Sequence, residues 1–296
     1  MRPIPYYLSR SALSTAIVVI AIVTAFGCTP AQDRDPDRED WIDLFNGRDL
    51  DDWTVKISGH DVGVNFANTF RVQDSVLSVR YDGYPDFDDQ FGHLFYKRAF
   101  SYYKVRMEYR FVGDQQPGAP SWALRNSGVM LHSQDPNTVA RDQDFPISVE
   151  MQFLGGLGND RARPTGSMCS PGTDIVFEGN VAETHCITST SDTYDGDQWV
   201  RAEAIVLGDS LIIHMINGDT VLQYSKPHVG GGAVNGYDPN LKQDGAPLVE
   251  GFIALQSEGH ALDFRNVLLL NLKGCTNPNA RNFRRYYVAS DPSACD

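Results

Sequence analysis

The stretch Tyr103-Lys-Val-Arg-Met-Glu-Tyr-Arg-Phe111 alternates apolar and charged side chains without a break. Side chains along a β-strand point alternately to the two faces of a sheet. Val105, Met107 and Tyr109 therefore share one face, and the charged side chains share the other. The pattern predicts a strand with one face on a hydrophobic core and one face in water.

Short apolar runs recur from residue 41 onward, separated by turns rich in Gly, Asp, Asn and Pro. They predict further strands at Thr69–Val72, Val76–Val79, Gly92–Tyr96, Gly128–His132, Ile147–Phe153, Trp199–Leu207, Leu211–Ile216, Val221–Tyr224, Gly251–Ser257 and Leu262–Leu272. No stretch after residue 41 has a helical stripe. Many short strands without helices predict an all-β fold, a two-sheet antiparallel jelly-roll sandwich.

Two long stretches interrupt these strands, Gly113–Arg125 and Gly155–Asp197. Both are expected to be irregular insertions. Loops of this length within a compact domain are usually functional or disordered. Because the second one contains two cysteines, an ordered functional loop is expected there.

The N-terminal segment has the features of an export signal. Arg2 and Arg10 precede the apolar run Ala12–Phe26, and small residues lie close to Cys28. Residues 1–27 therefore predict a signal peptide of the lipoprotein type, in which Cys28 is lipidated, with ordinary cleavage as an alternative. An uncleaved membrane helix is disfavoured because spanning a bilayer takes about 20 apolar residues. The prediction is an exported protein, periplasmic or on the cell surface, that meets the membrane only through a lipid anchor.

The remaining organisation follows from composition. The sequence predicts a charged tether over residues 28–40, the jelly-roll domain over 41–273 and a Cys-containing tail over 274–296. The formal net charge of −13 becomes −15 without residues 1–27, because Arg2 and Arg10 leave with that segment and no acidic residue does. So acidic a surface repels phosphate backbones, which excludes nucleic acid as a partner.

Four cysteines remain once Cys28 is set aside: Cys169, Cys186, Cys275 and Cys295. An even number of cysteines in an exported chain favours disulfides. Three pairings are possible, and the local one, Cys169–Cys186 with Cys275–Cys295, is preferred because each bond closes a polar loop that has little core of its own. A zinc site is the competing interpretation, but no two cysteines have a two-residue spacing.

The strand Pro146-Ile-Ser-Val-Glu-Met-Gln-Phe153 carries the first candidates for chemistry. If Val149, Met151 and Phe153 face the core, Glu150 and Gln152 face the other way, about 6–7 Å apart. A solvated face is the usual explanation of such a pair. The two flanking insertions favour a functional one.

Other residues are expected to converge on the same face. The strand Ser127–His132 would present His132, and the strand Gly251–Glu258 would present Gln256 and Glu258, followed by His260. Histidine shuttles protons near neutral pH, and Glu beside apolar walls can act as a base. Three candidates for substrate binding come from the insertions: Trp122 by stacking, His185 by lining the site or capping a loop, and Arg163 by binding a hydroxyl or an acidic neighbour.

These segments, in this order, resemble a known family, the 3-keto-disaccharide hydrolases, which have a concanavalin A-like jelly-roll fold. The resemblance runs from about Trp41 to Leu272 and is carried by Gly92-His-Leu-Phe, Tyr103–Phe111, Asn126-Ser-Gly-Val-Met-Leu-His132, Val149-Glu-Met-Gln152, Arg163-Pro-Thr-Gly, Gly196-Asp-Gln-Trp199, Asn217-Gly, Leu255-Gln-Ser-Glu258 and Phe264-Arg-Asn. The cysteine-containing loop and the tail look like features of an exported branch.

The resemblance implies cleavage of glycosides already oxidised at C3. A 3-ketone acidifies the C2 proton, so that a base can remove it, the aglycone can leave from C1, and water can add to the enone. Glu150 or His132 would be the base, His260 or Glu258 the acid, and Gln152 and Gln256 would hold hydroxyls. A divalent metal held by Glu and His could polarise the ketone, and nothing in the sequence requires one.

Two other functions fit the fold. A laminarinase-type glucanase needs two carboxylates about 5–5.5 Å apart. Such acids alternate along one strand, and here the second position is Gln152, so this interpretation is disfavoured. A non-catalytic carbohydrate-binding or adhesion module fits the fold and the anchor equally well, but it gives no reason for Glu and His to converge.

Overall fold

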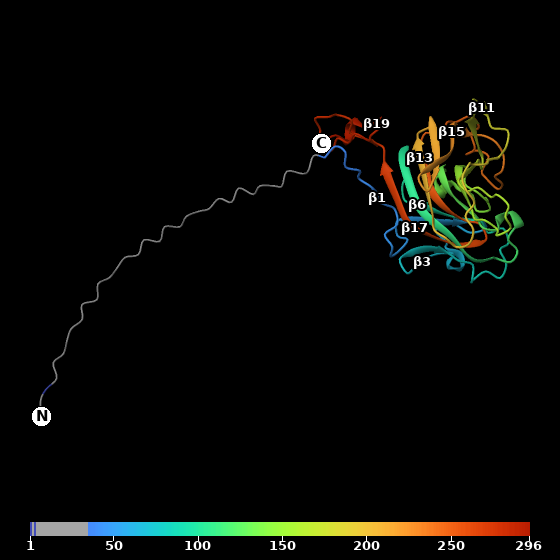
Figure 1. Ribbon diagram of the computed structural model, residues 1–296, viewed down its shortest axis with the longest axis horizontal. Helices are drawn as coiled ribbons and strands as arrows, with labels where there is room; N and C mark the ends of the chain where they lie inside the picture. Colours follow the sequence, from blue (N-terminus) through green and yellow to red (C-terminus); the bar gives the residue numbers. More distant parts are fainter. Residues whose placement is uncertain (2, 4–34) are drawn as a thin grey trace. The chain divides into compact units, whose positions relative to one another are not determined.

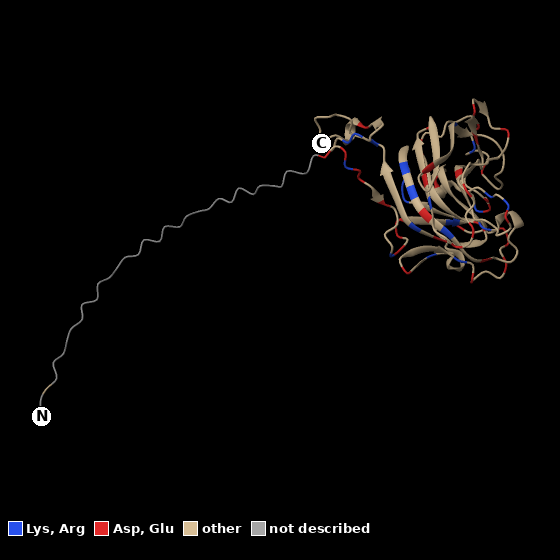
Figure 2. Ribbon diagram, viewed as in Figure 1, with Lys and Arg blue, Asp and Glu red and all other residues tan. Residues whose placement is uncertain are grey.

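The predicted strand around Tyr103–Phe111 is β6 (Tyr102–Gln115). It runs between β13 (Val200–Leu207) and β17 (His260–Asn271) in the larger sheet (Figure 1). Its apolar side chains are buried, and its charged side chains lie half-buried on the opposite face. On that face Lys104 and Arg106 contact Glu203 of β13 at 2.9 and 3.1 Å. Figure 2 shows positively and negatively charged residues following one another along β6.

The larger sheet has ten strands in the order β11-β10-β15-β14-β13-β6-β17-β4-β3, with β1 paired to β17. All of its pairs are antiparallel. Its other strands are β1 (Ile42–Asp43), β3 (Phe70–Gln73), β4 (Val76–Val79), β10 (Thr173–Phe177), β11 (Asn180–Val181), β13 (Val200–Leu207), β14 (Leu211–Ile216), β15 (Asp219–Val229) and β17 (His260–Asn271).

The smaller sheet has seven antiparallel strands in the order β12-β9-β8-β7-β16-β5-β2. They are β2 (Trp53–Ile57), β5 (Gly92–Tyr96), β7 (Asn126–Ser133), β8 (Val149–Leu154), β9 (Ser167–Cys169), β12 (Cys186–Ile187) and β16 (Phe252–Ser257). Within residues 35–296, single 3₁₀ turns lie in three connections, η1 (Phe66–Asn68), η2 (Ser121–Ala123) and η3 (Pro136–Thr138), and η4 (Pro292–Ala294) follows the last strand.

The hydrophobic core lies between the two sheets. Tyr109 of β6 stacks on Phe153 of β8, with ring centroids 4.3 Å apart and planes 7° from parallel. Val149, Met151 and Phe153 are fully buried in this core, as the alternation in the sequence predicted. The predicted all-β jelly-roll sandwich is confirmed.

The second insertion differs from the prediction. Residues 155–197 are not irregular throughout, because they contain β9 to β12. β9 extends the smaller sheet beside β8, and β10 joins the larger sheet beside β15. These strands are two to five residues long and lack a sustained alternation, so their pairing depends on neighbours that are distant in the sequence.

The computed structural model describes residues 1, 3 and 35–296, and residues 35–296 form one compact unit. Nearly all of the predicted signal peptide, Cys28 and the first part of the tether lie outside the described residues. Within residues 1, 3 and 35–296, no helix has the length and apolar character needed to span a membrane.

Both disulfides join the cysteines as the preferred local pairing predicted. Cys169 bonds to Cys186 across neighbouring strands β9 and β12, and Cys275 bonds to Cys295 near the C-terminus. Disulfides form in oxidising compartments outside the cytoplasm, which is consistent with an extracellular or periplasmic protein.

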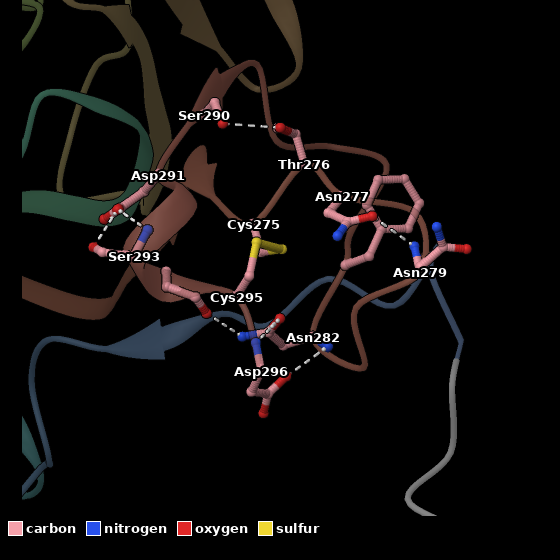
Figure 3. Close-up of a disulfide and its surroundings, with 12 residues drawn as sticks. Cys275, Thr276, Asn277, Asn279, Asn282, Ser290, Asp291, Ser293, Cys295 and Asp296 are labelled. Carbon is pink, nitrogen blue, oxygen red and sulfur yellow. Dashed lines mark hydrogen bonds between the residues drawn. A yellow bond between two sulfur atoms is a disulfide. The ribbon is translucent and has the colours of Figure 1, made fainter.

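The C-terminal tail contacts residues 36–40, the last part of the predicted tether. The Cys275–Cys295 bond closes the tail (Figure 3), in which β18 (Lys273–Gly274) pairs with β19 (Ala289–Ser290). From this tail, Arg284 Nε lies 2.6 Å from Asp40 Oδ2, and Arg285 Nη1 lies 2.5 Å from Asp37 Oδ2. The backbone N–H of Arg285 also donates to Pro36 O at 2.9 Å.

Replacing both Cys275 and Cys295 with Ser is expected to loosen the tail alone. A disulfide that closes a loop of this size contributes about 3 kcal/mol in the chain-entropy account. We expect faster proteolytic cleavage within residues 276–294 and unchanged catalysis, because none of these residues lines the cavity described below. The matched control is Thr276→Ala, which removes only a side-chain hydrogen bond to Ser290. Equal cleavage of the double variant and wild type would contradict the prediction.

Candidate active site

A cavity of about 690 Å³ lies on the outer face of the smaller sheet, the face turned away from the core. It is lined by residues of β7, β8, β9 and β12 and of the loops around them: Ser58, Asp89, Phe91, Pro120, Trp122, Asn126, Asp142, Asp144, Phe145, Glu150, Gln152, Cys169, Pro171, His185, Cys186, Ala233, Asn235 and Glu258. Both insertions predicted from the sequence therefore contribute to its walls.

Glu150 is the second residue of β8, paired with Met130 of β7 on one side and with Cys169 of β9 on the other. Its side chain lies over Gly128, where a Cβ atom would be 2.5 Å from Glu150 Oε1 and 2.8 Å from Cγ. Gly128 thus provides the space that the carboxyl group occupies. Glu150 is only 6% exposed, and Oε1 has no hydrogen-bond partner among the described residues.

Glu258 immediately follows β16 and is 3% exposed. Gln256 donates from Nε2 to Glu258 Oε1 at 3.4 Å, whereas Glu258 Oε2 has no partner among the described residues. The next residue, Gly259, has a positive φ of 90°, and its N–H donates to the Tyr81 hydroxyl at 2.8 Å. This turn fixes the carboxyl group at the cavity.

The two carboxyl groups resist ionisation. Burial raises the pKa of Glu150 to about 8. Burial and, secondly, the negative charge of Glu150 raise the pKa of Glu258 well above its usual value, while Arg163 opposes that shift. Two such groups titrate as a coupled pair, so near neutral pH at least one of them keeps its proton. The pair can therefore present one acid and one base.

Three of the predicted binding residues line the same cavity. Gln152 follows Glu150 on the outer face of β8, and His185 lies beside the Cys169–Cys186 disulfide. Trp122 is 52% exposed and stacks on Phe91, with ring centroids 5.7 Å apart and planes 16° from parallel. This exposed indole provides a flat apolar surface at the cavity.

His132 does not lie at this cavity, so its predicted placement is wrong. The register of β7 against β16 shifts between Ala254 and Phe252, and His132 itself has a positive φ of 48°. This bulge turns the imidazole away from Glu150. Its Nε2 lies 3.1 Å from Gly208 O, and its ring packs edge-on against Tyr103 of the core.

His260 is also placed elsewhere. It begins β17 in the other sheet, packs edge-on against Phe111 and lines a separate cavity of about 350 Å³ together with Arg125 and Asp114. Burial and, secondly, the positive charge of Arg125 lower the pKa of His260 to about 4. The predicted convergence of both imidazoles on Glu150 is therefore wrong.

Arg163 and Gln256 do not line the cavity but contact residues that form or adjoin it. Arg163 donates from Nη1 to the carbonyls of Gly155 and Arg125 at 2.6 and 3.0 Å, and from Nη2 to Leu124 O at 2.7 Å. Its guanidinium thus holds the segment that carries Trp122 and does not line the cavity. Gln256 is fully buried below the cavity and contacts Glu258.

Two further polar residues of this face, Asn126 and His93, were not predicted from the sequence. Asn126 lines the cavity, is 4% exposed, and its Oδ1 has no partner among the described residues. His93 of β5 pairs with Gln256 across the strands, and its Nε2 has no partner there either. Burial, with the charge of Lys56, lowers the pKa of His93 to about 3. The alternation of inward and outward side chains, extended one step back along β7, would have identified Asn126. The same alternation along Gly92–Tyr96 would have identified His93.

Residues 40–270 match the family described as the 3-keto-alpha-glucoside-1,2-lyase-like domain. The chain belongs to this family. Membership in the 3-keto-alpha-glucoside-1,2-lyase-like family makes it a carbohydrate-processing domain and confirms the resemblance stated from the sequence. No curated protein is significantly similar to the chain.

Two solved structures are similar to this chain at low sequence identity. A protein of Parabacteroides distasonis ATCC 8503, assigned provisionally as a glycosyl hydrolase, is 16% identical with a TM-score of 0.47 and aligns over 78% of this chain and 93% of its own. A Bacillus subtilis protein of unknown function with a galectin-like fold is 12% identical with a TM-score of 0.45, over 79% and 97%.

Proposed function

We propose that the chain cleaves 3-keto-glycosides, with Glu150 as the base and Glu258 as the acid. The observation that carries this proposal is the pair of buried carboxyl groups at the 690 Å³ cavity, each with one oxygen that has no hydrogen-bond partner among the described residues. Reactions that remove one proton and deliver another need groups with pKa values near the operating pH, and burial supplies that shift here. Family membership supports the substrate class.

In the first half of the proposed reaction, the Glu150 carboxylate removes the C2 proton of the 3-keto-sugar. The electron pair of the C2–H bond forms the C1=C2 double bond, and the C1–O bond breaks with its electrons going to the aglycone oxygen. Glu258 gives its proton to that oxygen, so the aglycone leaves as a neutral alcohol. Glu258 suits the acid because its pKa lies well above that of an ordinary carboxyl group.

In the second half, water adds to the enone. Glu258, now a carboxylate, takes a proton from water as the oxygen bonds to C1, and Glu150 returns its proton to C2. Both carboxyl groups recover their starting states. Gln152 and Asn126 line the same cavity and can hydrogen-bond the sugar hydroxyls.

The residues present do not form a metal centre around this pair. Among the described residues, the only group of three His, Cys, Asp or Glu ligand atoms within 4.8 Å of one another is Cys169, His185 and Cys186. Its two cysteines are joined as a disulfide. Since no third such ligand joins Glu150 and Glu258 among those residues, the proposed mechanism uses the proton transfers of these two side chains.

The test is to incubate the purified protein with an aryl 3-keto-glucoside and, separately, with the unoxidised parent glucoside. Release of the phenol from the oxidised substrate only, through an enone detectable by its ultraviolet absorbance, is the expected result. Turnover of the parent would indicate a glucanase, and binding without turnover of either would indicate a carbohydrate-binding module. Either outcome would overturn the proposal.

We also propose that Cys28 carries the lipid anchor, as the pattern around residues 12–28 indicates. Such an anchor would hold the domain at a membrane surface, where carbohydrate substrates outside the cytoplasm are accessible.

A further inference from the structure

The walls of the cavity around Glu150 carry charge of one sign. Five carboxyl side chains line it: Asp89, Asp142, Asp144, Glu150 and Glu258. Since burial raises the pKa of both Glu150 and Glu258, the negative charge near neutral pH comes mainly from the three Asp side chains. Among the lining residues that the structure describes, no Lys or Arg is present. An enclosed wall with only one sign of charge repels ligands of that sign and raises the local concentration of the other.

The acids at the rim are available to a ligand. Asp89 and Asp142 are exposed, and neither forms a salt bridge with a side chain of the described residues. Asp144 differs, since its carboxylate accepts hydrogen bonds from Asn235 at 2.7 Å. Asp89 and Asp142 therefore offer the cavity two exposed carboxylates that have no salt-bridge partner among the described residues.

An aromatic wall accompanies these acids. Trp122 stacks on Phe91, and Phe91 packs against Phe145 with ring centroids 4.9 Å apart. Cations are attracted to the face of an aromatic ring, most strongly to that of Trp. Exposed indole and unpaired carboxylates in one cavity match an organic cation.

The floor points independently to a bound ligand. Glu150 Oε1, Glu258 Oε2 and Asn126 Oδ1 belong to side chains more than nine-tenths buried, and none of these oxygens has a partner among the described residues. All three atoms can accept hydrogen bonds. These three acceptor oxygens suit the hydroxyl groups of a sugar. The leaving group of the glycoside would then contact Trp122 and the exposed carboxylates.

We propose that this cavity selects glycosides whose leaving group carries a positive charge, such as an alkylammonium group, and rejects anionic leaving groups. The inference rests on the proposed function in treating the cavity as the glycoside site. The sugar lies against Glu150, Glu258 and Asn126, and the cation lies between Trp122 and the carboxylates of Asp89 and Asp142.

The test compares three unoxidised aryl glucosides by isothermal titration calorimetry at low salt. Their para substituents are trimethylammoniomethyl, the isosteric neutral neopentyl group, and carboxymethyl. We expect the cationic glucoside to bind about tenfold more tightly than the neutral isostere and the anionic one to bind more weakly than both, with the differences shrinking as salt is added.

The double variant Asp89→Asn/Asp142→Asn should bring the cationic and neutral glucosides to similar affinity. Asp219→Asn is the matched control, because it removes the same kind of charge from an exposed residue of the β14–β15 hairpin and should keep the preference. Equal binding of the two isosteres by wild type, an unchanged preference in the double variant, or no binding of the cationic glucoside would overturn the inference.

Turnover of the corresponding 3-keto-glucosides separates this inference from the proposed function. Charge-selective binding without any cleavage of an oxidised substrate would overturn the proposed reaction and leave the charge preference standing. Cleavage of the oxidised substrate without charge-selective binding would overturn the charge preference and leave the proposed reaction standing.

Discussion

Glu150→Gln is expected to lower kcat on a 3-keto-glucoside by about 10²–10⁴-fold, the usual contribution of a positioned general base. The amide keeps the shape of the side chain but does not take the C2 proton. Substrate affinity should change much less than kcat. Single-turnover kinetics with circular dichroism of the variant would measure the loss and verify the fold, and an unchanged rate would exclude Glu150 as the base.

The same variant should change how stability depends on pH. In the folded protein, burial raises the pKa of Glu150 to about 8 from a usual value of 4.5, so folding favours the protonated form. The contribution is fully present below pH 4.5 and is lost as pH rises through 8. Wild type should therefore lose stability across this window, and Glu150→Gln should lose less. Glu178→Gln, at an exposed glutamate, is the control and should follow wild type in activity and in its pH curve.

Gly128→Ala is expected to impair catalysis without touching a carboxyl group. The added methyl group would lie 2.5 Å from Glu150 Oε1, so the acid must move away from its position. A displacement of about 1 Å at a reacting group can cost about 100-fold in rate. We expect kcat to fall by that order, with a modest loss of stability from overpacking.

Gly232→Ala is the matched control for this substitution. A Cβ atom there would meet nothing within 4 Å, and kcat and the unfolding temperature should stay at wild-type values. Full activity of Gly128→Ala would mean that the position of Glu150 on β8 does not matter for the reaction.

Much of the fold could be predicted because alternation is a local property. In Tyr103–Phe111 and Ile147–Phe153, the alternation of residue types predicts which side chains face the core. Those apolar side chains are buried in the structure. The short strands β9 to β12 could not be predicted in this way, since each is stabilised by a partner strand and not by its own sequence.

The site was predictable as far as strict alternation holds. Glu150, Gln152 and Glu258 reach one cavity because their strands are regular up to those residues. His132 does not reach this cavity, because a bulge at the end of β7 turns its side chain to the opposite face of the sheet. No residue pattern in the sequence predicts this bulge. The separation of His260 has a similar cause, since the chain turns at Gly259 and enters the other sheet.

The bond between Cys169 and Cys186 has a practical consequence for handling the protein. Both cysteines line the cavity and join the two outermost strands at that edge of the smaller sheet, so that wall depends on covalent closure. Material produced in a reducing cytoplasm, or stored with dithiothreitol, would carry a loosened wall beside intact carboxyl groups. Expression in an oxidising compartment and thiol-free assay buffers are the appropriate conditions for measuring its activity.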